Sequence, residues 1–162
     1  MKNNFIKILL IFILSFNMNN YVKSEELIFM SDTIELKSNG NVIEARNGVE
    51  IQGINNIKIN AKNSFYDNLN SELLLKDKVI FYDNENGIKI TSDEVLYKRK
   101  IEKIISSGKT QIYLADGYKI ITDNIEYLRK ENTIQSEAKT ILLDKFNNQV
   151  SVSDFKYLTD KK

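Results

Sequence analysis

The chain has 162 residues, of which 42% are apolar and 28% charged, and a formal net charge of +1. These values are typical of one globular domain and argue against intrinsic disorder. The absence of Cys and His excludes disulfide frameworks, Cys/His zinc sites, thiol nucleophiles and hydrolases that use an imidazole base.

The N-terminal segment has the features of a secretory signal peptide. A basic start at residues 1–7 precedes an apolar run at residues 8–16, and the small-residue site at Val22 and Ser24 predicts cleavage before Glu25. The apolar run is shorter than the ~20 residues of a spanning helix. An uncleaved membrane anchor remains the alternative to a signal peptide at residues 1–24.

Cleavage changes the charge of the chain. It removes Lys2, Lys7 and Lys23, so that 23 − 3 = 20 basic side chains face 22 acidic ones and the net charge becomes −2. Nucleic-acid binding depends on an excess of Lys and Arg. We therefore expect an exported domain at residues 25–162 that has no nucleic-acid partner.

From residue 25 onward the chain repeats two phrases. The first ends at Leu36, Tyr66, Tyr97, Tyr127 and Tyr157, with spacings of 30, 31, 30 and 30 residues. The second is centred on Val49, Val79, Thr110 and Thr140, with spacings of 30, 31 and 30 residues. A fixed period of this length is typical of stacked supersecondary units.

Both phrases alternate apolar and polar residues with period 2, and short polar turns such as "SNGN" and "DNENG" separate them. This pattern predicts β-strands throughout. The apolar positions that we predict to face inward are Ile34, Val49, Ile51, Ile59, Phe65, Leu75, Val79, Phe81, Ile90, Val95, Ile104, Ile112, Ile120, Ile125, Ile134, Leu142 and Phe155.

The first phrase contains a parity shift at a Ser/Thr-Asp pair. Apolar residues lie at Ile88 and Ile90 and then at Val95 and Tyr97, on either side of "SDE". A strand keeps one face inward through such a shift only if it inserts an extra residue, as a β-bulge does. We therefore predict bent strands that fold over into two facing sheets, with the Asp accepting backbone hydrogen bonds at each bend.

These phrases resemble the OstA-like domain of lipopolysaccharide-transport proteins. The first stands here as "SDTIEL", "AKNSFY", "SDEVLY", "TDNIEY" and "VSDFKY", so that the resemblance covers the whole exported part. The second copy departs from the pattern at Lys62, and the last copy lacks one residue before Phe155. The resemblance implies an all-β fold: a partly open, twisted β-jelly-roll of about ten antiparallel strands built from ~30-residue repeats.

The resemblance also implies a function. Proteins of this family carry the acyl chains of lipopolysaccharide in an apolar trough, so the inward residues become candidate lipid-binding residues and lipopolysaccharide the candidate ligand. The expected location is the periplasm, in a bridge that connects indirectly to the inner and outer membranes. An LptA-like bridge, an LptC-like anchored protein and the N-terminal part of an LptD-like outer-membrane translocon remain open, as does truncation after Lys162.

The sequence favours a binding protein over an enzyme. Four of the corner positions carry Asp, but nothing in the sequence places a nucleophile or a base beside them, and no cofactor or metal is predicted. Small inward residues such as Ser106 and Thr110 leave room for a ligand, whereas a filled, dry core remains equally open. A secreted structural β-repeat is therefore the alternative function.

Two surfaces of the predicted fold are candidates for binding a partner: the edge formed by the last strand, and the outer face. An open sheet leaves unpaired edges, and we expect the last strand to pair with another OstA-like domain or with a second copy, head to tail, through Val150, Val152, Phe155 and Tyr157. Lys58, Lys89 and Lys119 recur in register on the outer face. They are candidates for contacts with lipid phosphates, although a solvated face that prevents aggregation is the favoured reading.

Overall fold

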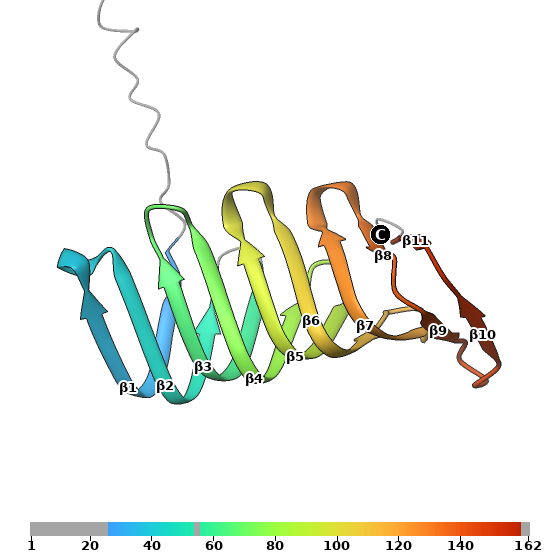
Figure 1. The fold of residues 1–162 in the computed structure, drawn as a ribbon, viewed down its shortest axis with the longest axis horizontal. Coiled ribbons are helices and arrows are strands. Elements are labelled where there is room, and N and C mark those ends of the chain that lie inside the picture. The colour runs from blue at the N-terminus through green and yellow to red at the C-terminus, as the bar shows by residue number, and fades with distance from the viewer. Residues whose placement is uncertain (1–25, 54–55, 160–162) are drawn as a thin grey trace, which may run out of the picture.

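The computed structural model describes residues 26–53 and 56–159 (Figure 1). The predicted signal peptide lies outside these residues. The described part is almost entirely β, with eleven antiparallel strands in one open sheet and three short 3-10 turns. The prediction of an all-β, partly open fold is confirmed.

Seven long strands come first and four short strands follow. The long strands are β1 (Ile28–Lys37), β2 (Val42–Gln52), β3 (Ile57–Asp67), β4 (Glu72–Asp83), β5 (Ile88–Lys98), β6 (Lys103–Tyr113) and β7 (Lys119–Leu128). The short strands are β8 (Thr133–Ser136), β9 (Thr140–Leu143), β10 (Gln149–Val152) and β11 (Phe155–Leu158). The 3-10 turns are η1 (Ser38–Gly40), η2 (Arg99–Ile101) and η3 (Arg129–Glu131).

Each long strand pairs with its neighbours in sequence, in the order β1 to β8 and then β11. Beyond β7 the sheet divides, because β8 pairs with one end of β7 and β9 pairs with the other. β10 then pairs with β9, and β11 with β8. The sheet does not close, so β1 forms one edge and β10 and β11 form the other. The last edge, which we predicted as one strand, is thus two short strands.

The predicted bends are present, and two kinds of residue make them. The strand register shifts around Asp32, around Asp93 and around Asp123, which confirms the bulge predicted from the parity shift. In the partner strands, Asp77 and Gly108 adopt positive φ values of 64° and 82° at the same shifts. Both strands of a pair therefore turn the corner together.

The corner at Asp93 shows why the Asp recurs. One carboxylate oxygen of Asp93 accepts a hydrogen bond of 3.0 Å from the backbone N–H of Lys109 in β6. A Cβ at Gly108 would lie 2.5 Å from the same carboxylate, so glycine is required there by both φ and space. The Ser92 hydroxyl donates to the carbonyl of Ser107 at 3.1 Å. These bonds satisfy backbone groups that the bulge removes from the ladder.

The bends fold the sheet into two facing layers, which rise from a common lower edge in Figure 1. Layer A contains the ends of the long strands that meet at the η turns, together with β8 and β11. Layer B contains the opposite ends, together with β9 and β10. Apolar side chains from both layers meet between them and form one buried cluster. Each large side chain in that cluster contributes roughly 1.5–3 kcal/mol through burial.

Candidate functional site

The inner face of layer A carries one row of residues that passes through nine strands. Directly opposite residues on antiparallel strands share a face, so the pairing register defines this row. Its members are Leu36, Ile43, Tyr66, Leu73, Tyr97, Ile104, Tyr127, Ile134 and Tyr157. From Ile43 onward, aliphatic residues alternate with the tyrosines that end the first phrase, because the two phrases supply alternate strands; the first copy has Leu36 in place of the tyrosine.

Layer B carries a matching row, which is aliphatic and aromatic throughout. Its members are Phe29, Ile51, Ile59, Phe81, Ile90, Ile112, Ile120, Leu142 and Val150. The row begins on the edge strand β1 and ends on the edge strand β10. An apolar strip therefore runs through the sheet from one edge to the other.

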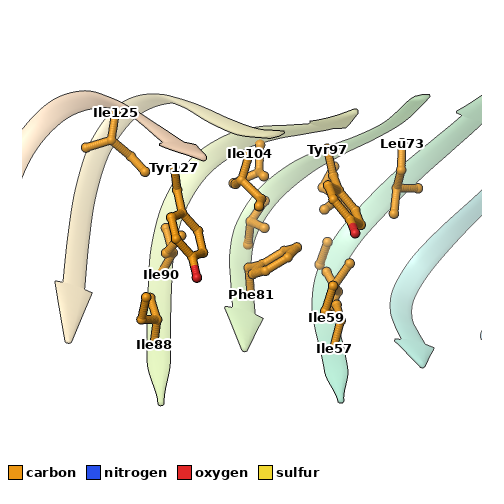
Figure 2. Packing of buried hydrophobic residues seen from close by; sticks show 14 of the residues in the cluster. Ile57, Ile59, Leu73, Phe81, Ile88, Ile90, Tyr97, Ile104, Ile125 and Tyr127 are labelled. Atoms are coloured by element: carbon orange, nitrogen blue, oxygen red, sulfur yellow. The ribbon is translucent and has the colours of Figure 1, made fainter. Parts of the chain in front are cut away.

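The two rows pack against each other in the middle of the molecule. Phe81 of layer B and Tyr97 of layer A make an edge-to-face ring contact with centroids 5.5 Å apart. Figure 2 shows the rings of Tyr97 and Tyr127 directed into the space that Phe81 and Ile88 enter from the other layer. Phe81 is fully buried. The middle section is thus filled by its own side chains, which answers the question that the sequence left open.

Small polar residues lie at the crease, the line of bends where the two layers join. They do not line a groove between the layers. Ser106 and Thr110 are fully buried, and their hydroxyl oxygens are 2.8 Å apart. Thr122, directly opposite Thr110 on β7, accepts a hydrogen bond from the Thr140 hydroxyl at 3.1 Å. A cavity of about 680 Å³ lies nearby, where Ser106 and Ser136 line it together with charged residues such as Glu126 and Lys156. Its polar lining does not suit an acyl chain.

A buried ionic cluster joins the two layers at their free tips. The carboxylate of Asp83, in layer B, accepts hydrogen bonds of 2.8 Å from the Tyr127 hydroxyl and from Nε of Arg129 in layer A. Arg129 also binds Glu85 and, at 3.2 Å, Glu102. Asp83 is fully buried and Arg129 nearly so. We call Asp83, Tyr127 and Arg129 the latch, because they close the interior on the side opposite the crease.

The electrostatics of the latch favour the charged pair. Burial opposes ionisation of Asp83, but hydrogen bonds from Arg129, Asn86 and Tyr127 outweigh it and hold the pKa of the carboxyl below its usual value. Burial, together with the negative charge of Asp83, raises the pKa of Tyr127 far above its ordinary range. Burial alone would lower the pKa of Arg129, but its contacts with Asp83 outweigh burial and raise the pKa above the ordinary value. The tyrosine therefore stays neutral and the ion pair stays charged at neutral pH.

The latch was not predicted from the sequence, although one signal was available. Asp83 follows Val79 and Phe81 at spacings of two in β4, so it occupies an inward position of an otherwise apolar alternation. A carboxylate at such a position requires a buried partner. The partner, Arg129, lies 46 residues later in the chain, and no local pattern connects the two.

The structure buries most of the predicted inward residues and corrects the assignment of one. Phe65 lies on the outer face and is 40% exposed, whereas its neighbours Ser64 and Tyr66 are buried. The parity shift in β3 falls around Ala61 and Lys62, which places Ser64 rather than Phe65 in register with Leu75 and thus inward. The prediction for Phe65 was wrong because this copy lacks the Asp that marks the corner elsewhere.

Inner residues become exposed at the two edges of the sheet. Ile34 is opposite the buried Ala45, which places it on the inner face, yet 44% of its surface is exposed. Leu36 is 68% exposed in the same strand, and Val150 is 57% exposed at the other edge. In contrast Phe155 is almost completely buried. The apolar strip is therefore covered in the middle and accessible at its ends.

The described residues include neither a candidate metal site nor a candidate membrane-spanning helix. Within 26–53 and 56–159 there is no group of three or more acidic, His or Cys side chains that could hold a metal ion. The same residues include no helix that is long and apolar enough to cross a membrane.

The fold resembles that of a known transport protein. LptH is described as the LptA homologous periplasmic component of the conserved lipopolysaccharide transport device from Pseudomonas aeruginosa. It is 13% identical to this chain, with a TM-score of 0.58 over 64% of this chain and 76% of LptH. The sequence matches no family model and no curated protein. The chain therefore has an LptA-like fold, since similarity at this identity is one of architecture.

Proposed function

We propose that this chain is a periplasmic component of lipopolysaccharide transport that holds lipid A acyl chains between the two layers of its sheet. The observation that carries the proposal is the pair of apolar inner rows, which pass through the sheet from edge to edge. The LptA-like fold supports it, because LptH is a component of such a transport device. A binding protein of this kind needs no catalytic residues.

The packing of the interior defines how an acyl chain enters. Because Phe81 and Tyr97 touch across the middle, a chain can lie there only if the layers move apart. At the β1 edge, Ile34 and Leu36 already present apolar surface to solvent. Each buried methylene contributes about 0.8 kcal/mol, so several methylenes offset the loss of one aromatic contact. Entry from an edge followed by separation of the layers is the route that this packing favours.

The open edges supply the means of assembly. β1 pairs on one side with β2, and β10 and β11 pair with β9 and β8. A second OstA-like domain, or a second copy of this chain head to tail, adds its edge strand by β-augmentation and continues the apolar strip. The same geometry serves an LptA-like bridge, an LptC-like anchored protein or the N-terminal domain of an LptD-like translocon. All three act in the periplasm in this proposal: cleavage of the predicted signal peptide fits the bridge and the translocon domain, whereas an uncleaved N-terminus fits the LptC-like protein.

Site-specific photo-crosslinking tests the proposal. A photoreactive residue at Ile112, which is fully buried on the inner face, is expected to capture lipopolysaccharide in cells. The matched control is the adjacent Gln111, which lies on the outer face of the same strand and is expected to capture none. Leu142, half-buried near the edge of layer B, should crosslink at least as strongly as Ile112. Equal capture at Ile112 and Gln111 would refute an interior lipid site.

A secreted structural module with a dry core is the second candidate. The observation that favours it is the complete burial of Ile59, Phe81, Ile90 and Ile112 by the protein's own side chains. In that case the interior positions are expected to crosslink neither lipopolysaccharide nor phospholipid, while the protein remains folded. The crosslinking experiment therefore separates the two candidates.

A further inference from the structure

The outer face of layer B carries a row in which lysines and tyrosines alternate. Lys58, Tyr82, Lys89, Tyr113 and Lys119 are directly opposite one another on the consecutive strands β3 to β7. We call these five residues the Lys–Tyr row. Neighbouring strands are about 4.8 Å apart, so the row forms a straight strip of alternating cations and rings across five strands.

The rings hold the lysine side chains in defined positions. The ammonium nitrogen of Lys89 lies 5.6 Å from the ring centroid of Tyr82 and 5.4 Å from that of Tyr113. The ammonium nitrogen of Lys119 lies 5.1 Å from the ring of Tyr113. Each such cation–π contact contributes roughly 0.5–1 kcal/mol at an exposed site. Two ammonium groups are therefore ordered around one ring before any anion binds.

Lys89 and Lys119 differ from three lysines of layer A. On layer A, Lys76 lies 3.0 Å from Glu94, Lys98 lies 3.0 Å from Glu72, and Lys103 also contacts a glutamate. Among the described residues, neither Lys89 nor Lys119 has a carboxylate within salt-bridge distance. Those three lysines of layer A are neutralised by glutamates, and within the Lys–Tyr row Lys58 is likewise paired with Glu50 at 2.9 Å. The charge that the row offers to an external anion is therefore that of Lys89 and Lys119.

Exposed aromatic residues lie at the adjacent tips of layer B. Tyr118 is 44% exposed, and Phe146 is 74% exposed with Lys145 5.1 Å from its ring. A Cβ on Gly117 would lie 3.3 Å from that of Lys145, so the two turns are neighbours.

The acidic residues at these tips are engaged by the protein itself. Asp144 accepts hydrogen bonds of 2.8 Å from the backbone N–H groups of Phe146 and Asn148. Asp116 accepts one of 2.7 Å from the Tyr157 hydroxyl. Because these donors are neutral groups, both carboxylates keep their negative charge, and Lys89 and Lys119 are the cations without a carboxylate partner that the row offers to an anion.

We propose that the Lys–Tyr row docks the protein onto the surface of an anionic phospholipid membrane. Tyrosine is favoured at the membrane interface because its side chain has an apolar ring and a polar hydroxyl end. An exposed phenylalanine such as Phe146 adds apolar surface that can enter the headgroup region. Each lysine near an anionic surface contributes about 1 kcal/mol. Nucleic acid is a poorer fit, since its binding requires a larger excess of cations. This docking is independent of whether the interior carries lipid.

Vesicle co-sedimentation tests the docking surface. The full chain is mixed with vesicles of phosphatidylcholine and phosphatidylglycerol in equal parts, and the bound fraction is measured at low and high salt. The double variant Lys89→Gln with Lys119→Gln should lower the partition coefficient roughly 25-fold, because about 1 kcal/mol per lysine corresponds to roughly fivefold each. Tyr113→Ala should lower it less, since it only releases the two ammonium groups.

The matched control removes the same charge from layer A. The double variant Lys76→Gln with Lys98→Gln should bind within about twofold of the parent, because its lysines are already paired with glutamates. All variants keep the N-terminal segment, so its contribution to binding is the same in each. Equal losses in the two double variants, or equal binding of the parent to pure phosphatidylcholine vesicles, would overturn the proposal. Displacement of the protein from vesicles by dilute inorganic phosphate would also overturn it, by indicating an isolated anion site.

Discussion

The middle of the folded sheet and its N-terminal edge have the same alternation of residues but different degrees of burial. In the middle, Phe81 and Ile90 are fully buried between strands on both sides and a facing layer. At the edge, Ile34 and Leu36 occupy inner positions and remain substantially exposed, since β1 pairs with β2 alone. Alternation thus decides which face a side chain takes, whereas the number of covering strands decides how much of it is buried.

The middle and the edge of this apolar surface therefore have different roles. The covered middle supplies the stability of the domain, because each large side chain there loses its contact with water on all sides. The uncovered edge keeps apolar surface available for a partner strand or a ligand. An edge of this kind is a recognised hazard for aggregation unless a specific partner covers it. Matched substitutions in the middle and at the edge therefore test whether coverage by neighbouring strands accounts for the difference.

The largest effect is expected from a charge placed in the middle. Phe81→Asp removes a fully buried ring and leaves an unpaired carboxylate between the layers, which should cost more than about 4 kcal/mol and prevent folding. Ile34→Asp, on the same inner face at the edge, should change the free energy of unfolding by less than about 1 kcal/mol. Circular dichroism and urea denaturation measure both. Similar losses in the two variants would show that the edge is as well covered as the middle.

The next largest loss of stability is expected from a substitution in the latch, which closes the interior on the side opposite the crease. Arg129→Met removes the cation that pairs with the fully buried Asp83 and should lower the free energy of unfolding by about 3–5 kcal/mol. The double variant with Asp83→Leu should recover much of that loss, because no uncompensated charge then remains. The measurement is urea denaturation of the single and double variants. A single variant as stable as the parent would mean that the latch does not hold the layers together.

A smaller loss of stability is expected when the pH is lowered. The pKa of Asp83 is lower in the folded protein than the usual ~3.9 of an unfolded chain. Its contribution to stability is therefore fully present above that unfolded value, and it is lost as the pH falls through the lower folded value. Denaturation at a series of pH values between neutral and strongly acidic should show this decline.

Asp83→Asn serves as the control for the acid experiment. Partly exposed carboxyls such as Asp67 and Asp144 also have lowered pKa values, so the parent loses stability in acid through several groups. The Asn variant should lose less stability over the same pH range than the parent does. An unchanged slope would show that the buried carboxylate of the middle contributes no more to acid sensitivity than carboxylates at the surface.

Much of the fold could be predicted from local pattern. The period-2 alternation placed Leu75, Val79 and Phe81 on one face, and the parity shift across "SDE" placed a bend at Asp93. Both are properties of a few consecutive residues, which is why the sequence is sufficient for them. The same reasoning failed at Phe65, where the corner lacks its Asp and the position of the extra residue could not be read.

Contacts between distant residues could not be predicted in this way. The pairing of Asp83 with Arg129, the order of the ammonium groups around Tyr113 and the contrast with the glutamate-paired lysines of layer A depend on which strands become neighbours. The sequence placed Lys89 and Lys119 on the outer face but gave no measure of their charge partners. The candidate sites therefore emerge only when the strands are assembled.

Bent β-strands in a repeated unit follow from the amino-acid sequence alone, because the alternation and the corner residues are properties of short segments that recur every 30 or 31 residues. The packing of the interior in the middle and its exposure at the edges become apparent only in the folded structure. The physical reason is that burial depends on what covers a side chain from both layers and both neighbouring strands, and a folded sheet covers its centre completely while its first and last strands have a neighbour on one side.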